Sequence, residues 1–462
     1  MTIDDLQGTL RARLDRLAAE HGVVGASMAV QKGDTVVEAA TGLTNLRTGV
    51  EVTTDTVFQI GSISKSYTAT LVMQLVDEGL IDLDAPVSRY LPDFRTTDPE
   101  AAASVTVRRL LSHTSGMDGD VFDDFGRGDE CVERYVAAMA GIAHTHPVGA
   151  FFSYCNSGYV LLGRLIEHFR QATWDAALRQ HLLGPLGAED TVTLADEAIL
   201  RRAAVGHIPS GEDGALQVAP MWFFGRAMGP AGVITAPARE VLVLARMHLD
   251  DGRASDGTQL LSPGAVKAMR QLEVEIPDPY VLGDGWGLGW ILYRSGSPLV
   301  FGHDGTTVGQ NAYLRIVPDA DLAVCLLTNG GGAGALFDAL VRPLLVELAG
   351  AELNPPPQLP PAPVEVDRTA FVGTYERSGV SIEVSLDEDN RIWIQARSTG
   401  PLAGTVPPEP PKELVPLTDS LLITAEPDKR VGRHGSFKFL EPGPAGFGYI
   451  HSGARATPRV SG

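Results

Sequence analysis

The chain has 462 residues, of which 44% are hydrophobic and 20% are charged, and its formal net charge is -20. This length and composition are typical of a globular protein with two or three domains, or of one large domain with an appendage. So negative a surface repels phosphate backbones and anionic lipids, which argues against nucleic acid and membrane surfaces as partners.

The three cysteines, Cys131, Cys155 and Cys325, form no paired metal-binding spacing, and their odd number argues against a disulfide framework. The first residues are polar and acidic rather than a basic leader with an apolar core, so we expect no secretory signal. No stretch is long and apolar enough to span a bilayer. These features predict a cytoplasmic protein without a metal ion or another cofactor.

The first 350 residues or so predict one α/β unit. A mostly helical stretch runs from Ser62 to Leu249, and another helix is expected over residues 334–348. Strand-like runs lie on either side of the helical stretch, at residues 25–31, 35–42, 56–60, 290–293, 312–317 and 322–328. We therefore expect an antiparallel sheet shared by both ends of this unit, with a helical insertion between them.

A proline-rich run over residues 354–363 predicts a stiff, extended linker and marks a domain boundary. Beyond it, short alternating segments broken by Gly, Pro and Asp predict a small β-barrel. The expected domains are a catalytic domain over residues 1–353, the linker over 354–363 and the barrel over 364–462.

Ser62 and Lys65 are three residues apart at the start of a predicted helix, so their side chains share one face. A serine hydroxyl needs an adjacent base to act as a nucleophile, and a lysine can serve where desolvation keeps its amine neutral. The helix N-terminus adds positive potential where an oxyanion would form. Ser64 competes as nucleophile but does not share its face with Lys65. S-x-x-K is common by chance, and a solvated helix start is the alternative interpretation.

Two further motifs bring polar groups that suit acyl transfer. Tyr154 and Asn156 are two residues apart, so a phenol and a carboxamide can face one cleft from a single turn. His303 begins the run His303-Asp-Gly-Thr, where Gly305 would allow a substrate backbone to approach. Taken singly, Tyr154 is compatible with a core aromatic and His303 with a surface histidine.

In the order S-x-x-K, Y-x-N and H-x-G, the motifs resemble those of the serine β-lactamase and penicillin-binding-protein superfamily, close to its class C branch. Residues 105–116, 229–236 and 286–290 support the resemblance, which covers roughly residues 10 to 350. It implies a class C-like α/β domain, with an antiparallel sheet flanked by helices plus a helical domain, followed by a lipocalin-like barrel.

The resemblance also implies roles for the motif residues. Ser62 would be the acylated nucleophile, Lys65 its base, Tyr154 the proton relay, and Asn156 the group that positions substrate and Lys65. The backbone N–H groups of Ser62 and Thr306 would form the oxyanion hole. His303 replaces the lysine of the family's K-T-G motif. A mostly neutral histidine gives up the charge that pairs with the carboxylate of penicillin, so we do not expect penicillin resistance.

A lipocalin-like domain after such a catalytic domain resembles two groups. One is the D-aminopeptidase-like hydrolases. The other is the stand-alone penicillin-binding-protein-type thioesterases, cytoplasmic enzymes that release and macrocyclise nonribosomal peptides. In the second group a barrel arginine reaches toward the cleft. Arg455 and Arg459 are the candidates, and Arg455 is preferred because it is expected to lie in a Gly-containing loop. A solvated arginine near the chain end is the alternative.

Three functions remain open. The leading one is a thioesterase that takes a peptidyl thioester from a peptidyl carrier protein onto Ser62 and cyclises the peptide. The close rival is a D-stereospecific peptidase or amidase, or an esterase, in which water resolves the acyl-enzyme. The third is a non-catalytic sensor or assembly protein. This function is disfavoured because the chain retains all five polar residues of the three motifs: Ser62, Lys65, Tyr154, Asn156 and His303. The negative net charge also disfavours docking to acidic carrier proteins unless basic residues cluster locally.

Other polar residues carry weaker signals. His113 is expected to be structural, His144 and His146 lack partners at metal-ligand spacing, and Cys155 is expected to point away from the cleft. A solvated loop near the cleft mouth is expected for a group of acidic residues that does not follow EF-hand spacing: Asp118, Asp120, Asp123, Asp124, Asp129 and Glu130.

Overall fold

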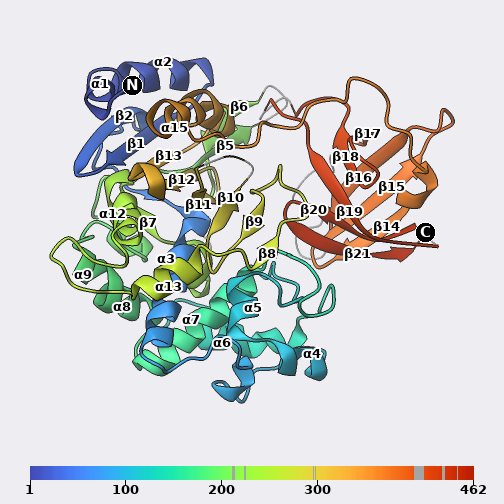
Figure 1. Ribbon diagram of the computed structural model, residues 1–462, viewed down its shortest axis with the longest axis horizontal. Helices are drawn as coiled ribbons and strands as arrows, with labels where there is room; N and C mark the ends of the chain where they lie inside the picture. The colour runs from blue at the N-terminus through green and yellow to red at the C-terminus, as the bar shows by residue number, and fades with distance from the viewer. Residues whose placement is uncertain are drawn as a thin grey trace.

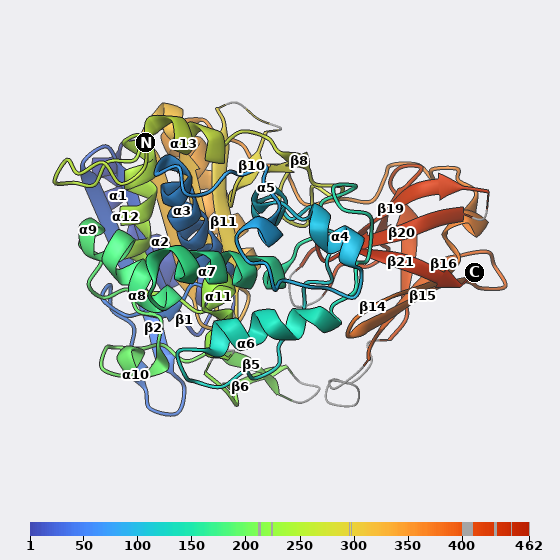
Figure 2. The same ribbon diagram turned by 90° about the horizontal axis from the view of Figure 1, so that it is seen from below.

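A computed structural model describes residues 1–210, 214–222, 225–294, 296, 298–399, 410–428, 432–444 and 446–461. A large α/β unit lies on one side of the molecule and a β-barrel on the other (Figures 1 and 2). None of the helices in these ranges has the length and apolar character needed to cross a membrane.

The α/β unit is built on a nine-stranded antiparallel sheet whose central strands come from both ends of the unit. Strand β1 pairs with β13, with Ala26 opposite Thr328. In spatial order the strands are β3 (Val50–Glu51), β2 (Thr35–Asn45), β1 (Gly25–Lys32), β13 (Leu322–Thr328), β12 (Asn311–Val317), β11 (Val300–Thr306), β10 (Ile291–Tyr293), β9 (Gly285–Trp286) and β8 (Val274–Glu275). The predicted shared sheet is confirmed, except that the expected strand at residues 56–60 forms β4 (Phe58–Gln59), which pairs with β7 (Thr235–Ala236) in a separate two-stranded sheet.

Both faces of the sheet are buried, which explains why its central strands are nearly continuous apolar runs. Along β1, Ala29 packs toward the helical insertion, while Met28 and Val30 pack toward the helices at the chain's N-terminus and after β13. Successive side chains of a strand point to opposite faces, so one strand serves two hydrophobic cores.

The helices form two layers. The layer on one face of the sheet contains α1 (Ile3–Gln7), α2 (Leu10–Glu20), α14 (Ala333–Leu336) and α15 (Arg342–Ala349), with the π-helical turn Phe337–Val341 between the last two. The insertion supplies the rest: α3 (Ser64–Asp77), α4 (Pro99–Ser104), α5 (Val107–Leu111), α6 (Cys131–Ala138), α7 (Asn156–Arg170), α8 (Trp174–Leu178), α9 (Gly184–Leu186), α10 (Ala195–Ala198), α11 (Gly229–Gly232), α12 (Ala238–Leu249) and α13 (Pro263–Met269).

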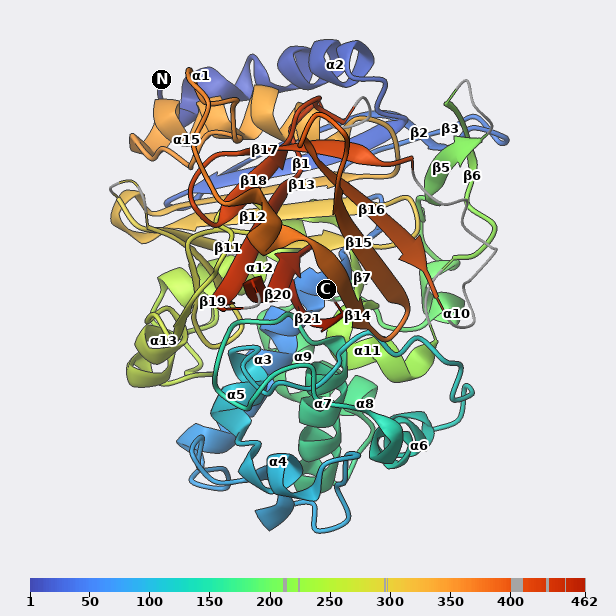
Figure 3. The same ribbon diagram turned by 90° about the vertical axis from the view of Figure 1, so that its right-hand side faces the viewer.

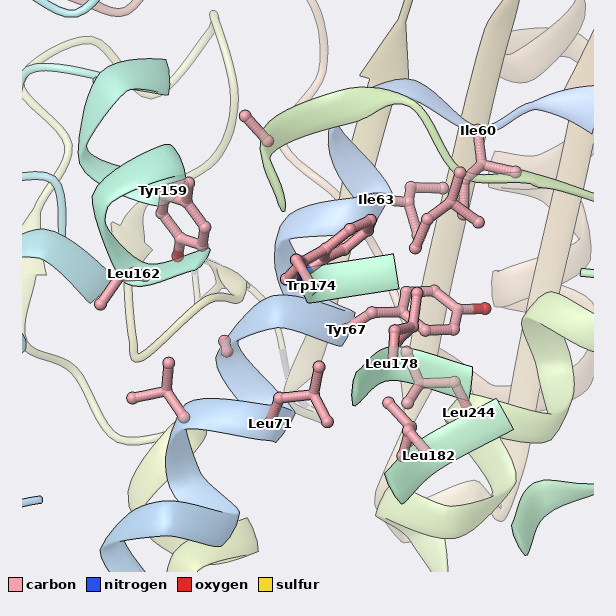
Figure 4. Close-up of a cluster of buried hydrophobic side chains, with 14 of the residues drawn as sticks. Ile60, Ile63, Tyr67, Leu71, Tyr159, Leu162, Trp174, Leu178, Leu182 and Leu244 are labelled. Atoms are coloured by element: carbon pink, nitrogen blue, oxygen red, sulfur yellow. The ribbon is translucent and has the colours of Figure 1, made fainter. Parts of the chain in front are cut away.

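Helix α3 lies at the centre of the insertion, and its residues from Ser64 to Leu75 are all buried. Figure 4 shows Tyr67 and Leu71 of α3 among side chains of neighbouring helices, including Trp174 and Leu244. Burial of a helix on all sides fixes its position, so the residues at its N-terminus have a rigid base.

Residues 350–367 contain no helix or strand. The chain then forms a closed eight-stranded antiparallel barrel, in which the first strand also pairs with the last. Its strands are β14 (Gly373–Arg377), β15 (Val380–Leu386), β16 (Ile392–Ser398), β17 (Lys412–Pro416), β18 (Leu421–Thr424), β19 (Ser436–Gly443), β20 (Gly446–Ser452) and β21 (Arg455–Ser461). The α/β fold and the C-terminal barrel are as predicted. Seen from the barrel side, β20 and β21 lie in front of the α/β unit (Figure 3).

Candidate active site

Ser62 lies on a 3-10 turn, Gly61–Ile63, directly before α3. The prediction that the chain is helical from Ser62 onward is confirmed, because this turn continues without a break into α3. Gly61 adopts a φ of 52°, and a Cβ at this position would come within 2.6 Å of the Thr306 nitrogen. The turn thus depends on a glycine and on close packing against β11.

The competing hydroxyl, that of Ser64, is committed to the fold. Ser64 is fully buried, and its Oγ donates to the Gly61 carbonyl at 2.7 Å and accepts from the Ile234 N–H at 3.1 Å. Ser62 is only partly buried, so its hydroxyl is the accessible one.

Lys65 is fully buried at the first turn of α3. Its Nζ lies 3.2 Å from Ser62 Oγ and donates to Asn156 Oδ1 at 2.7 Å and to the Ala231 carbonyl at 2.6 Å. Burial lowers the pKa of Lys65 well below its ordinary value. A neutral amine has two N–H groups and one lone pair. With both N–H groups used by carbonyl oxygens, the lone pair is left for the Ser62 hydroxyl.

Tyr154 lies just before α7, and its ring centroid is 4.8 Å from Lys65 Nζ. Burial raises the pKa of Tyr154, while the neighbouring Ser62 hydroxyl and the Arg455 guanidinium oppose that rise. The phenol is therefore protonated near neutral pH and can donate a proton to a leaving group beside Ser62.

His303 lies on β11 and is almost fully buried. Its Nδ1 is 2.6 Å from the Asp304 carbonyl, which fixes Nδ1 as the donor in the neutral ring. Burial, with Lys65 nearby, lowers the pKa of His303 to about 3. The imidazole of His303 is thus uncharged at neutral pH.

The backbone of β11 lies directly against the turn that carries Ser62. A Cβ on Gly305 would come within 2.9 Å of the Ser62 nitrogen and 1.9 Å of the Ile60 carbonyl oxygen. Only a glycine permits this approach. It places the Gly305–Thr306 segment of β11 against residues 60–62.

The barrel inserts a turn, Gly453–Ala454, into the α/β unit. The Ala454 carbonyl accepts from the Tyr154 N–H at 2.8 Å, and Ser153 Oγ accepts from the Ala456 N–H at 3.1 Å. Arg455, which directly follows Ala454, places its guanidinium 5.1 Å from the centroid of the Tyr154 ring. The other candidate, Arg459, instead bonds to a carbonyl of the barrel itself, that of Val372.

The prediction of a solvated acidic loop is wrong for two of its residues. Asp118 is buried and accepts from the Ser378 N–H of the barrel at 2.7 Å. Asp120, whose side chain is 14% exposed, binds Arg455 and Arg377. Their partners in the barrel lie more than 250 positions away, so local spacing gave no signal. The remaining four acidic residues, Asp123, Asp124, Asp129 and Glu130, are exposed as expected.

The remaining candidates support the Y-x-N turn or lie apart from it. His113 is buried with its ring centroid 4.2 Å from that of Tyr154, and its Nδ1 accepts from the Cys155 N–H at 3.0 Å. Cys155 Sγ accepts from the Gly158 N–H at the start of α7. His144 contacts Thr96. No group of three metal-ligating side chains occurs in the described ranges.

Comparison with known proteins identifies the family. The Beta-lactamase family model matches residues 10–346. Penicillin-binding protein 4 of Amycolatopsis lactamdurans is 46% identical over 79% of this chain and 97% of its own length. A crystal structure of SurE with D-Leu is 31% identical, with a TM-score of 0.80 over 99% of this chain and 100% of that one. D-amino acid amidase from Ochrobactrum anthropi SV3 is 26% identical, with a TM-score of 0.59 over 71% of this chain and 92% of its own.

Proposed function

Since this chain belongs to the beta-lactamase family and is a serine acyl-transfer enzyme by fold, we propose that it is a stand-alone thioesterase that releases and macrocyclises a nonribosomal peptide. Its substrate is a peptidyl thioester on a carrier protein, and its acyl-enzyme forms on Ser62. The enzyme acts in the cytoplasm, which is consistent with its three cysteines being free and buried.

In the first step Ser62 Oγ attacks the thioester carbonyl carbon, and the hydroxyl proton passes to the neutral amine of Lys65. The N–H groups of Ser62 and Thr306 bind the oxyanion. The intermediate then collapses with cleavage of the C–S bond, and the leaving thiolate takes a proton from Tyr154, which Lys65 reprotonates. The 3.2 Å separation of Lys65 Nζ and Ser62 Oγ suits this transfer.

In the second step the peptide's own amine attacks the Ser62 ester. Its proton passes to Lys65, now neutral again, and the Ser62 oxygen leaves with a proton from Tyr154 or Lys65. An oriented intramolecular nucleophile reaches effective molarities of about 10⁵–10⁸ M, so a cleft that folds the peptide back favours the amine over water. The inserted turn at Ala454 covers one side of Tyr154 and helps to exclude water.

The observation that carries the proposal is a histidine, His303, buried on β11 with its Nδ1 bonded to the Asp304 carbonyl. A lysine at this position would pair with the carboxylate of a penicillin or a stem peptide, whereas a neutral imidazole supports an acyl donor without that carboxylate. A peptidyl thioester is such a donor. The similarity to SurE with D-Leu and to a D-amino acid amidase supports a D-residue at the acylating end.

A second candidate is a D-stereospecific peptidase or amidase, or an esterase, in which water resolves the same acyl-enzyme. The similarity to the amidase over most of the α/β unit favours it. The two candidates share every residue and differ only in the second nucleophile.

Product analysis separates them. Synthetic peptidyl thioesters ending in a D- or an L-residue are incubated with the enzyme, and the products are measured by mass spectrometry. The proposal predicts mainly cyclic peptide from the D-terminated thioester. Linear acid as the dominant product across varied thioesters, with fast cleavage of D-aminoacyl amides, would establish the hydrolase instead.

A further inference from the structure

Asp120 joins the two units of the molecule at the catalytic cleft. It lies in the loop between α5 and α6, and its carboxylate accepts from Arg455 Nε at 2.6 Å and Arg455 Nη2 at 2.8 Å. Arg377 Nη1 of the barrel donates to the same carboxylate at 3.1 Å. Two parallel N–H···O bonds from one guanidinium fix the plane of the carboxylate as well as its position.

The fourth donor to Asp120 is a residue of the Y-x-N motif. Asn156 Nδ2 donates to Asp120 Oδ1 at 3.1 Å, while Asn156 Oδ1 accepts from Lys65 Nζ at 2.7 Å. A carboxylate only accepts hydrogen bonds, so it holds the NH2 side of the amide toward itself. The oxygen side of Asn156 is thereby held toward Lys65. A continuous chain of hydrogen bonds runs from the barrel arginines to the catalytic amine.

We propose that Asp120 is a positioning residue that couples barrel docking to the catalytic base, by fixing the orientation of Asn156 and through it the amine of Lys65. The inference rests on the proposed role of Lys65 as base. It does not depend on whether an amine or water resolves the acyl-enzyme.

The charges at this junction act on Lys65 in opposite directions. The Arg455 guanidinium lowers the pKa of Lys65, and the Asp120 carboxylate raises it. As an ion pair they largely offset each other. Removing Asp120 alone leaves the Arg455 charge uncompensated and lowers the pKa of Lys65. Removing Arg455 alone leaves the Asp120 charge uncompensated and raises that pKa.

Asp118 supplies a matched control. It lies two residues before Asp120 and also bonds to the barrel, at the Ser378 N–H. Within the described part of the chain it bonds to neither Asn156 nor Lys65, and its carboxylate meets Asp120 only at the Asp120 backbone. A purely structural role at the interface would be shared by both aspartates, whereas positioning of the base belongs to Asp120 alone.

The test measures, against pH and in the full-length protein, the rate at which a fluorophosphonate probe phosphonylates Ser62 with loss of fluoride. In Asp120→Asn, loss of the negative charge lowers the pKa of Lys65, so we expect the acidic limb of the profile to move down by about one pH unit. The maximal rate should fall roughly tenfold, because the amine is less well oriented. Arg455→Gln should move the limb in the opposite direction. Asp120→Glu, which keeps the charge, should restore the limb of the native enzyme.

Asp118→Asn should leave both the limb and the maximal rate unchanged. Equal profiles for Asp120→Asn and Asp118→Asn would overturn the inference and reduce Asp120 to an interface ion pair. If Asp120→Asn does not fold, the shift of the acidic limb in Arg455→Gln is the deciding measurement. An unshifted limb in that variant would contradict the coupling between the barrel and Lys65. Absence of labelling at Ser62 in the native enzyme would instead refute the proposed nucleophile, so the two failures are distinguishable.

Discussion

Ser62 and Lys65 are held at the start of a helix buried on every side, whereas Arg455 extends from the end of a turn on a small barrel. The first pair is fixed by packing in the largest hydrophobic core of the molecule. The arginine is fixed by an ion pair to Asp120 across an interface. Under the proposed function, the α/β unit supplies the nucleophile and the base, and the barrel adjusts them. Changes to the first should abolish reaction, and changes to the second should alter affinity or pH dependence.

The largest effect is expected at the nucleophile. Ser62→Ala should abolish turnover and covalent labelling by a fluorophosphonate. Ser64→Ala should retain labelling but unfold at a lower temperature, because it leaves the Ile234 N–H and the Gly61 carbonyl without their buried partner. Labelling that survives the first substitution and disappears in the second would reverse the assignment.

The next effect concerns proton transfer. Lys65→Ala and Tyr154→Phe should each slow turnover by about 10²–10⁴-fold, the range found for general acid–base groups. Steady-state kinetics on an activated ester provides the measurement, and a metal chelator added to the native enzyme should change nothing. Near-native rates in Lys65→Ala would show that another base activates Ser62.

A third prediction tests the barrel through its inserted turn. Ala454 is 3% exposed at the interface with a φ of 67°, so Ala454→Asp would bury an uncompensated charge there. KM for a peptidyl thioester should rise roughly tenfold or more, with a smaller change in kcat. Asn390→Asp is the control, because Asn390 has a φ of 60° in an exposed barrel turn. An unchanged KM in Ala454→Asp would remove the barrel from the site.

The smallest effect is on stability against pH. Burial lowers the pKa of His451, at the barrel interface, and of His248, in the insertion, to about 3 each. Between the ordinary value of 6.5 and about 3, the unfolded chain binds protons that the folded chain does not, so stability falls as pH falls through this window. Each histidine should contribute a loss of about 2 kcal/mol at pH 5.

Thermal unfolding at pH 7 and pH 5 measures that loss. The variants His451→Leu and His248→Leu should each show a smaller difference between the unfolding temperatures at pH 7 and pH 5 than the native protein does. If the barrel unfolds before the α/β unit at pH 5, only His451→Leu should raise the temperature of the first unfolding transition. A native protein equally stable at both pH values would contradict the burial of neutral histidines.

The sequence predicted most of the α/β unit because its signals are local. S-x-x-K, Y-x-N and H-x-G each occupy a few consecutive positions, and the structure brings them together through strand β11 and the helices α3 and α7. The 3-10 form of the first helical turn could not be predicted, because this turn depends on the close approach of Gly61 and Thr306, which are 245 positions apart.

Asp118 and Asp120 were missed for the same physical reason. In sequence they belong to an acidic run, and such runs are usually solvated. In the structure they contact the barrel, through Ser378, Arg377 and Arg455. Long-range pairing of this kind leaves no pattern in a single sequence.

Direct detection of the acyl-enzyme tests the central claim most closely. The native enzyme is mixed with a peptidyl thioester, quenched within one turnover and digested, and the modified peptide is identified by mass spectrometry. The account predicts the mass of the peptidyl group on Ser62, formed at least as fast as the overall reaction and greatly slowed in Lys65→Ala. Turnover without an adduct, or an adduct on Ser64 or Cys155, would contradict it.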